Sequence, residues 1–568
     1  MPAQLRRFAV PVDWSAAALA VLLGLFIVIG ASFDATDSPA WFASSAGAAL
    51  GSALVVLGLG LVFYVAIKLV FDWLARRSDA RPAAKITSMR TALRRSLLPT
   101  SGVLFAGWMP WLLIHFPGNV DSDTITQLFQ WLGLAVRSDH HPWFDTMVFG
   151  WFWNLGHAFG DYNIGLFVFL VLQEAATALG MGLALVYLGR LGLPRRWRWT
   201  LTVLAAVFPV FAIAVSVMSK DSFAGVFWMP FLVLFVEAIR TRGQVLMRPW
   251  IGASALAIVI PLVLAKRTNI YLVVVCLIVL LVLAARPARL RILGGGVVAV
   301  LVTSVLWPLA ILPAAGVQAA TNTDILSIPL QQTARTVLEH GSSLPATEKQ
   351  AIDAVLRYDG LAQAYVPRRS DSVKSRWNSH ATTSQRLAYA VVWLDELVRY
   401  PSTYFAATAD NTFPYFAPVT PIAFQESLTL NRYIDVWLSW SIPGTTREQI
   451  AQVALSLHQP AALAPLRTAV DRAAAVFNKN PFSSAAWYCS WIPLLALAYA
   501  IRRRSGLLAL ATIPLFLNLG FLVAGPIALS RYMIPSIYGS VLIVGLMTLR
   551  IPLSRRPGGT ASGSRGSS

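Results

Sequence analysis

Residues 14–33 read WSAAALAVLLGLFIVIGASF, twenty positions without one charged side chain. A helix needs roughly 20 apolar residues to cross the hydrocarbon layer of a membrane. Comparable runs recur along the chain, in which 56% of the 568 residues are hydrophobic and 13% are charged. We therefore expect an all-α polytopic membrane protein. Twelve spans are predicted, at 14–33, 44–70, 97–115, 163–188, 200–217, 222–240, 250–265, 270–285, 291–312, 484–501, 507–525 and 532–549.

The basic residues predict the orientation of these spans, because Lys and Arg are retained on the cytoplasmic side of short loops. Placing the arginine-rich segments inside gives cytoplasmic N- and C-termini. The net charge of +20 is then explained by topology and by attraction to anionic lipid, and no nucleic-acid partner is expected. The arginine-rich segments lie at 76–95, 190–198, 240–248, 286–291, 502–504 and 550–565.

The predicted spans and loops divide the chain into five parts. Segment 144–160 is apolar, short and aromatic, and we expect an interfacial or re-entrant helix there. Within the third part below (313–483), Ser384 is the expected N-cap of a helix that stops before Pro401. The parts are an N-terminal two-helix hairpin with a basic loop (1–96), a transmembrane core with an outer loop at 116–162 (97–312), an extracytoplasmic helical domain (313–483), three C-terminal spans (484–550) and a disordered cytoplasmic tail (551–568).

Charged and polar side chains gather at the predicted outer ends of several different spans. Ionisable groups at or near hydrocarbon are costly and usually functional, and one bundle could bring these loops together around a cleft at the outer membrane surface. The loops contain Asp121, Asp123, Asp139, His140, His141 and Asp145; Ser219, Lys220 and Asp221; Lys266, Arg267 and Asn269; and Ser530, Arg531 and Tyr532.

Carboxylates beside Lys and Arg suit glycosyl transfer from a lipid phosphate. A carboxylate can remove the proton of an acceptor hydroxyl while cations stabilise the departing phosphate. Asp121 and Asp123 are the candidate bases. The candidate phosphate ligands are Lys220, Arg267 and Arg531, to which His140 or His141 could add a hydrogen bond or a positive charge.

Each group also has a purely structural interpretation. The pair Asp121 and Asp123 could form an Asx turn, and Lys220 with Asp221 could be a local ion pair at a helix end. Lys266, Arg267 and Arg531 could be interface anchors. The functional interpretation depends on the coincidence of these groups across separate loops.

Six short motifs together resemble uncharacterised bacterial membrane proteins grouped with the GT-C superfamily of polyprenyl-phosphate-sugar-dependent glycosyltransferases. They are Phe116-Pro-Gly, Asp123-Thr-Ile-Thr-Gln127, Asp139-His-His-Pro142, Ser219-Lys-Asp221, Ser327-Ile-Pro-Leu-Gln-Gln332 and Ser530-Arg-Tyr-Met-Ile-Pro535. The resemblance covers about 97–550 and leaves the first two spans as an added hairpin.

This resemblance implies a GT-C-like bundle of about twelve transmembrane helices in the bacterial plasma (inner) membrane, with the active site on the extracytoplasmic face. It implies interfacial helices in the first core outer loop and a later outer loop that covers the donor. It favours Asp123 as the base and Arg531 as a ligand of the donor phosphate, and it adds Gln331 and Tyr532 to the candidate substrate-binding residues.

The expected activity is therefore inverting transfer of a sugar from a polyprenyl-phosphate donor to an extracytoplasmic glycan or lipid acceptor. No cofactor is expected to be essential, although Asp121, Asp123 and the His pair could hold a divalent cation. Two alternatives remain open. One is an O-antigen-type polymerase or ligase with a pyrophosphate-linked donor, for which Arg368, Arg369 and Lys374 would supply charge, and the other is a non-enzymatic transporter or flippase.

Overall fold

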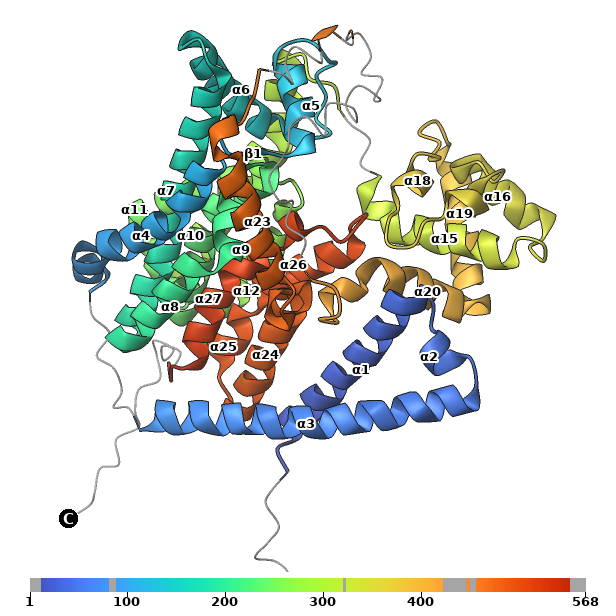
Figure 1. Cartoon of the computed structure of the whole chain (residues 1–568), viewed down its shortest axis with the longest axis horizontal. Helices are drawn as coiled ribbons and strands as arrows, with labels where there is room; N and C mark the ends of the chain where they lie inside the picture. Colours follow the sequence, from blue (N-terminus) through green and yellow to red (C-terminus); the bar gives the residue numbers. More distant parts are fainter. Residues whose placement is uncertain are drawn as a thin grey trace, which may run out of the picture.

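The computed structural model describes residues 12–80, 88–319, 323–421, 446, 448–449 and 456–551. The described chain is almost entirely helical, which confirms the all-α class (Figure 1). Seven of its helices are long and apolar enough to cross a membrane, and a bent pair makes up to eight. The protein is therefore a multi-pass membrane protein. The predicted disordered tail lies outside the described residues from 552 onward.

The seven long helices coincide with predicted spans. They are α1 (Trp14–Thr36), α3 (Ala46–Asp79), α4 (Met89–Ile114), α7 (Tyr162–Arg190), α10 (Lys220–Arg240), the run Arg286–Ala314 made of α13 (Arg286–Leu301), η3 (Val302–Ile311) and α14 (Leu312–Ala314), and the run Gly506–Ala524 made of α25 (Gly506–Ala511) and α26 (Ile513–Ala524).

The remaining predicted spans are shorter or broken. Helices α8 (Arg195–Val207) and α9 (Pro209–Val215) meet at a bend of 61°, where Pro209 lacks the N–H that a continuous helix requires. The other four positions are helical but short, so twelve spans exceed what the described helices support. These are α11 (Pro249–Ala265), α12 (Asn269–Leu283), η8 with α24 (Trp487–Trp491 and Ile492–Arg503) and α27 (Ile534–Met547).

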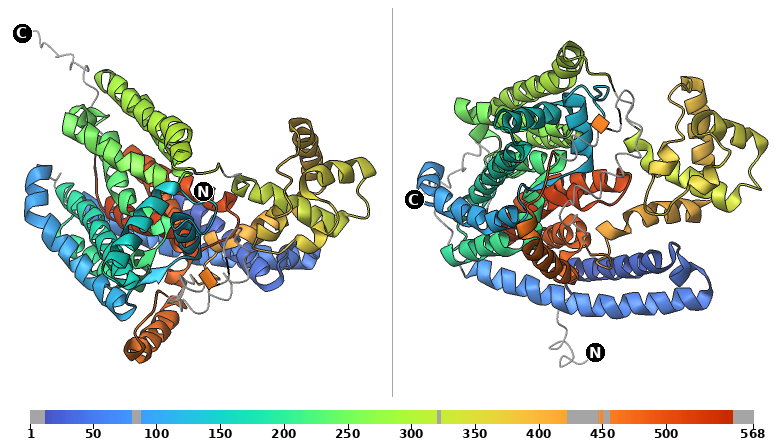
Figure 2. Two further views of the ribbon diagram at one scale, coloured as in Figure 1. Left: turned by 90° about the horizontal axis from the view of Figure 1, so that it is seen from above. Right: turned by 45° about the horizontal axis from the view of Figure 1, so that its top comes forward.

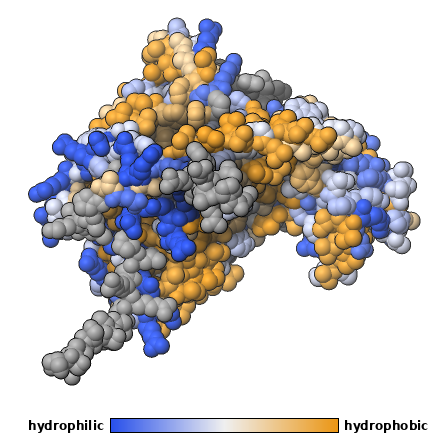
Figure 3. All heavy atoms as spheres, turned by 90° about the horizontal axis from the view of Figure 1, so that it is seen from below, coloured by the Kyte–Doolittle hydropathy of each residue, from blue (hydrophilic) through white to orange (hydrophobic). Residues whose placement is uncertain are grey.

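Helices α1 and α3 form the predicted N-terminal hairpin and pack against one another (Figure 2, right). The hairpin is fastened to the end of α24, because Arg502 pairs with Asp13 at 2.7 Å and also with Asp72. The outer face of α3 is apolar and exposed at Leu50 and Leu61. The face of the molecule shown in Figure 3 carries wide apolar areas, as contact with lipid tails requires.

A compact helical lobe stands beside the bundle (Figure 2). It contains η4 (Asp324–Leu326), α15 (Ser327–His340), α16 (Ala346–Leu356), α17 (Leu361–Ala364), α18 (Asp371–Lys374) and α19 (Thr383–Arg399) around its own apolar core, and α20 (Pro401–Thr412), which packs on α15. Further along the chain, α23 (Ala464–Asn478) lies against the bundle instead, where Asp471 meets His115 at 2.8 Å. The predicted domain at 313–483 thus includes both lobe and bundle elements.

Helix α19 begins earlier than expected. Its N-cap is Thr382, which exchanges hydrogen bonds with Gln385 in a capping box, so the prediction of Ser384 as the cap is wrong. Gln385 favours Thr382 as the cap because its side-chain oxygen accepts a hydrogen bond from the backbone N–H of Thr382. The predicted stop before Pro401 is confirmed, and Pro401 opens α20.

Candidate functional site

A two-stranded parallel pairing joins the ends of two bundle segments that are distant in the sequence. Strand β1 (Asn119–Val120) follows α4 and pairs with β2 (Val217–Met218), which follows α9. The backbone N–H of Asp121 continues this ladder by donating to the carbonyl of Met218 at 3.1 Å. The pairing therefore places Asp121 next to the segment that begins α10.

Two helix N-termini then present the charged side chains. Asp121 caps α5 (Ser122–Trp131), and its Oδ1 accepts a hydrogen bond from the N–H of Asp123 at 3.0 Å. Ser219 caps α10, and its Oγ accepts from the N–H of Ser222 at 3.1 Å. Short polar caps of this kind satisfy N–H groups that have no partner within the helix. As a result Asp123 and Lys220 lie in the first turns of neighbouring helices.

Arg531 completes a cluster around Asp123. Lys220 Nζ and Arg531 Nη2 each lie 2.9 Å from Asp123 Oδ2. The guanidinium also pairs with Asp121 through Nη1. Arg531 belongs to the short helix η9 (Ser530–Met533), which leads into α27. The site thus combines the segment between α4 and α5, the start of α10 and the segment that leads into α27.

A second layer of alternating charge supports this cluster. Asp221, which is 1% exposed, pairs with Lys266 at 2.7 Å and lies 3.6 Å from Nε of Arg531. The Tyr532 ring lies beneath two cations, at 5.2 Å from Lys266 Nζ and 5.2 Å from the Arg531 guanidinium carbon. Cations over an aromatic face are attracted by the ring quadrupole. These contacts fix the direction in which Arg531 points.

His141 faces the same pair of charges. Its Nδ1 lies 3.3 Å from Lys220 Nζ and 3.7 Å from Asp123 Oδ2. Burial, together with the positive charge of Lys220, lowers the pKa of His141 to about 3. The imidazole is therefore neutral at neutral pH, and Nδ1 can accept a hydrogen bond from the Lys220 ammonium.

The pKa values of Asp121 and Asp123 are shifted in opposite directions. Burial disfavours the charged form of Asp123, but the positive charges of Lys220 and Arg531 outweigh it and hold the pKa well below its usual range. Burial raises the pKa of Asp121, and Arg531 offsets that effect only in part. Asp123 is therefore the carboxylate that stays ionised and faces two cations, whereas Asp121 acts locally as a helix cap.

The cluster lines a polar cavity of about 570 Å³ between the bundle and the lobe. On the lobe side, Ser370 N–H donates to the carbonyl of Pro526 at 2.9 Å, and Arg369 forms a β-bridge with Ile527. These backbone contacts hold the lobe close to the segment that carries Arg531. Lobe residues at the cavity wall are Asp324, Arg369, Asp371 and Lys374, and bundle residues include Asp121, Asp123, His140, His141, Lys220, Arg531 and Tyr532.

Three predicted residues lie apart from the cluster. Arg267 forms an ion pair with Asp139 and lines an adjacent cavity of about 180 Å³, which Lys220, Lys266 and Tyr532 also line. The buried Asn269 amide donates to the carbonyl of Leu262 at 2.9 Å. Gln331 donates to the carbonyls of Val366 at 3.0 Å and Arg369 at 3.2 Å, so it supports the lobe loop at the cavity wall without lining it. The side chains of Asn269 and Gln331 thus stabilise nearby backbone through hydrogen bonds to carbonyl groups.

The four lobe residues at the wall were not predicted as parts of one site with Asp123. The sequence associates Arg369 and Lys374 only with a pyrophosphate-linked donor, and it gives no signal that distinguishes Asp324 and Asp371 from other loop residues. Lys374 pairs with Asp324 at 2.6 Å and with Asp371 at 3.0 Å. Their sequence neighbourhood contains only ordinary loop and helix-end signals, so no local pattern reveals that they face the bundle.

The carboxylates of the cluster are engaged by cationic side chains. Within the described ranges, no group of three or more His, Cys, Asp or Glu side chains is arranged to hold a metal ion. Asp121 and Asp123, the proposed oxygen ligands, face Arg531 instead. The described arrangement therefore fits an anionic group that contacts Lys220 and Arg531 better than it fits a resident cation.

Long apolar helices with a charged cavity at one end define an all-α, multi-pass membrane protein with an attached helical lobe. Residues 132–559 match the family of unknown function DUF6020, and the chain belongs to this family. No curated protein and no solved structure matches the chain. The matched range includes Lys220 and Arg531, while Asp123 and Asp121 lie nine and eleven positions before its start at residue 132.

Proposed function

We propose that the protein is an inverting, GT-C-type membrane glycosyltransferase that moves a sugar from a polyprenyl-phosphate donor to an extracytoplasmic glycan or lipid acceptor. The observation that supports this most is the position of Asp123 Oδ2, 2.9 Å from both Lys220 and Arg531 in a polar cavity at the end of apolar helices. A base and two phosphate-binding cations are what a single displacement from a lipid phosphate requires.

In the proposed reaction, the acceptor hydroxyl oxygen attacks the anomeric carbon while Asp123 takes the hydroxyl proton. The bond between the anomeric carbon and the phosphate oxygen breaks, and the phosphate leaves with the electron pair toward Lys220 and Arg531. One displacement inverts the anomeric configuration.

The ion pairs suggest how donor binding would activate the base. Lys220 and Arg531 hold the pKa of Asp123 well below its usual range, which makes it a weak base before the donor arrives. A donor phosphate would compete with Asp123 for the same two cations, and its negative charge would raise the pKa of Asp123. Base strength would then rise when the donor is in place.

The same proposal predicts the side of the membrane on which the site lies. The charged cavity would open on the extracytoplasmic face of the bacterial plasma membrane, with both termini cytoplasmic. The arginine clusters support this orientation, because Arg502 and Arg503 lie at the ends of the bundle where α1 begins and α3 ends and basic loops are retained inside.

The polymerase or ligase alternative keeps one specific observation in its favour. Arg369 and Lys374 line the same cavity as Lys220 and Arg531, and a pyrophosphate needs more cationic contacts than a monophosphate. A transporter is favoured only by Glu174. This residue is buried in α7, and among the described groups neither of its carboxylate oxygens has a hydrogen-bond partner.

The test is to incubate the purified protein in nanodiscs with a panel of polyprenyl-phosphate and polyprenyl-pyrophosphate sugars and to measure the released lipid phosphate. We expect polyprenyl phosphate from a monophosphate donor, unchanged release in EDTA, and a product with inverted anomeric configuration by NMR. Release only from pyrophosphate donors would favour the polymerase. Absence of release from every donor, with movement of an unmodified substrate across vesicles, would favour the transporter.

A further inference from the structure

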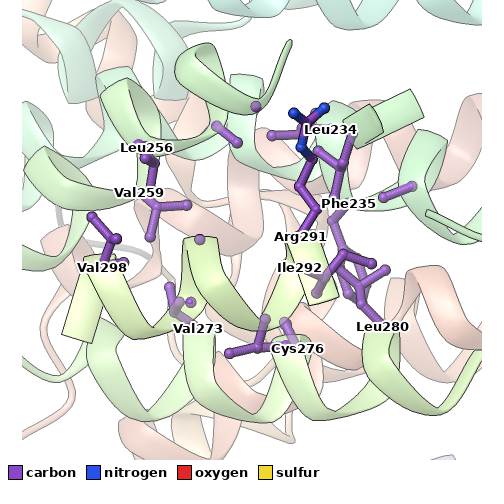
Figure 4. Close-up of a pocket in the computed structure, with 18 of the residues that line it drawn as sticks. Leu234, Phe235, Leu256, Val259, Val273, Cys276, Leu280, Arg291, Ile292 and Val298 are labelled. Atoms are coloured by element: carbon purple, nitrogen blue, oxygen red, sulfur yellow. The ribbon is translucent and has the colours of Figure 1, made fainter. Parts of the chain in front are cut away.

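A further cavity lies among four helices, in the halves of α11 and α13 that are remote from Asp123 and Lys220. Its volume is about 390 Å³, and side chains of α10, α11, α12 and α13 line it. Figure 4 shows an apolar lining, with Leu256, Val273 and Phe235 around the space and the Arg291 side chain at its edge. Of the described residues that line it, Arg291 alone carries a charge.

Consecutive glycines keep this cavity open. Gly294, Gly295 and Gly296 follow Arg291 by three to five positions and all line the space. A Cβ added at Gly294 or Gly295 would meet no heavy atom within 4 Å. Glycine in a helix interior costs up to about 1 kcal/mol relative to alanine, so packing between helices does not explain these two residues. Because these two residues have no side chain, the space beside α13 stays open.

The end of the bundle next to this cavity has a concentrated positive charge. The two connectors there lie together, since Ala285 N–H donates to the carbonyl of Arg242 at 3.0 Å and Arg291 donates to the carbonyl of Met247. No Asp or Glu occurs between Glu237 and Asp324 in the sequence. The arginines of these connectors are Arg242, Arg248, Arg286, Arg289 and Arg291.

The nearest acid before this stretch is already engaged. Glu237, near the end of α10, pairs with Arg190 at 3.0 Å and with Arg240 at 2.6 Å. Arg286, Arg289 and Arg291 therefore lie in a stretch of the sequence, between Glu237 and Asp324, that contains five or more basic residues and no acidic one. Clusters of basic residues beside membrane helices attract anionic lipid head groups.

We propose that this cavity binds an acyl chain of an anionic glycerophospholipid, with the lipid phosphate at Arg291. The apolar walls accept the chain, the open faces of Gly294 and Gly295 provide its width, and the connector arginines select a negatively charged head group. The site is separate from the charged cavity and does not depend on the proposed transferase activity.

The test uses the full-length protein in nanodiscs that contain equal amounts of phosphatidylglycerol and phosphatidylcholine. After mild detergent extraction, native mass spectrometry counts the lipids that remain bound. We expect the wild type to retain phosphatidylglycerol in preference to phosphatidylcholine. Gly295→Leu should fill the cavity and lower lipid retention at least fivefold, without harming a helix in which leucine is preferred to glycine.

The matched control is Gly51→Leu in α3, where an added Cβ also meets nothing within 4 Å and the position does not line this cavity. It should retain lipid like the wild type. Arg291→Gln should keep an acyl chain bound but reduce the preference for phosphatidylglycerol about fivefold. Equal retention by the two glycine variants would overturn the proposal, and so would an unchanged lipid preference in Arg291→Gln.

Discussion

Nη2 of Arg531 lies 2.9 Å from Oδ2 of Asp123 and joins two segments of the chain that are 408 residues apart in sequence. The same guanidinium pairs with Asp121, so one side chain holds both carboxylates at the start of α5. The start of α5 and the segment that leads into α27 are therefore electrostatically coupled. If the transferase proposal is correct, this coupling also places the base beside the phosphate ligand.

Removal of the Arg531 guanidinium should destabilise the protein as well as inactivate it. Arg531→Ala leaves Asp121 and Asp123 buried without their shared cation, and breaking a buried ion pair in this way costs about 3–5 kcal/mol. Asp121→Asn in the same chain should recover part of that loss. Chemical unfolding in detergent measures the free energy of unfolding of the single and the double variant. An Arg531→Ala protein as stable as the wild type would show that the ion pairs of Arg531 contribute nothing to stability.

The pH dependence of stability should contain a contribution from His141. The pKa of His141 is lowered to about 3 in the folded protein, whereas an unfolded histidine titrates near 6.5. Between these values the unfolded chain binds the extra proton, so stability falls as pH falls, by about 2 kcal/mol from pH 6.5 to pH 5.

His141→Gln should lose this part of the pH dependence. Burial raises the pKa of Asp121 and Asp145, and their titration acts in the opposite direction. The quantity to measure is therefore the difference between the unfolding free energies of wild type and variant at each pH. A difference that stays constant between pH 7 and pH 5 would contradict a neutral, buried His141.

Close packing of α6 (Trp143–Ala158) on α7 should make Gly165 intolerant of substitution. A Cβ at Gly165 would lie 2.0 Å from the carbonyl oxygen of Phe152, and this backbone atom cannot move without shifting α6. Gly165→Ala should therefore cost about 1–3 kcal/mol. In α4, Gly102 has open space around its Cβ position, and Gly102→Ala should be neutral or up to about 1 kcal/mol stabilising. Equal thermal stability of the two variants would refute the packing argument.

The N-terminal hairpin should restrain the lobe. Arg368 donates to the carbonyls of Phe33 at 3.1 Å and Asp34 at 3.0 Å and to the carboxylate of Asp37 at 2.9 Å. Arg368→Ala should increase hydrogen exchange in the loop at 366–370 and at the end of α1, with no change in α10. Lys349→Ala, elsewhere on the lobe, serves as the control. Unchanged exchange in both segments would show that the hairpin does not hold the lobe.

The sequence allowed the class of fold and much of the cluster to be predicted, because both depend on local signals. Asp123, Lys220 and Arg531 each lie at the end of an apolar segment, where a charged residue stands out. Span length was less predictable, since proline and the loop geometry decide where a helix ends. Pro209 breaks one predicted span into α8 and α9, although the surrounding residues are apolar throughout.

The lobe side of the cavity could not be predicted from local patterns. Arg369 reaches the bundle through a β-bridge to Ile527, which is 158 positions later in the chain, and only the folded lobe creates that contact. Conversely, Asn269 lies beside Lys266 and Arg267 in sequence but donates to the backbone of α11. Proximity in sequence to charged residues does not separate a residue that lines a cavity from one that supports a helix end.

The most direct test of the central claim is the rate at which Asp123→Asn releases polyprenyl phosphate from the donor that the wild type accepts. Loss of a general base lowers rates by about 10²–10⁴-fold, and we predict a loss in this range with the protein still folded. Asp161→Asn, which changes the N-cap of α7 outside the cavity, should retain wild-type release. Full activity of a folded Asp123→Asn protein would contradict the account.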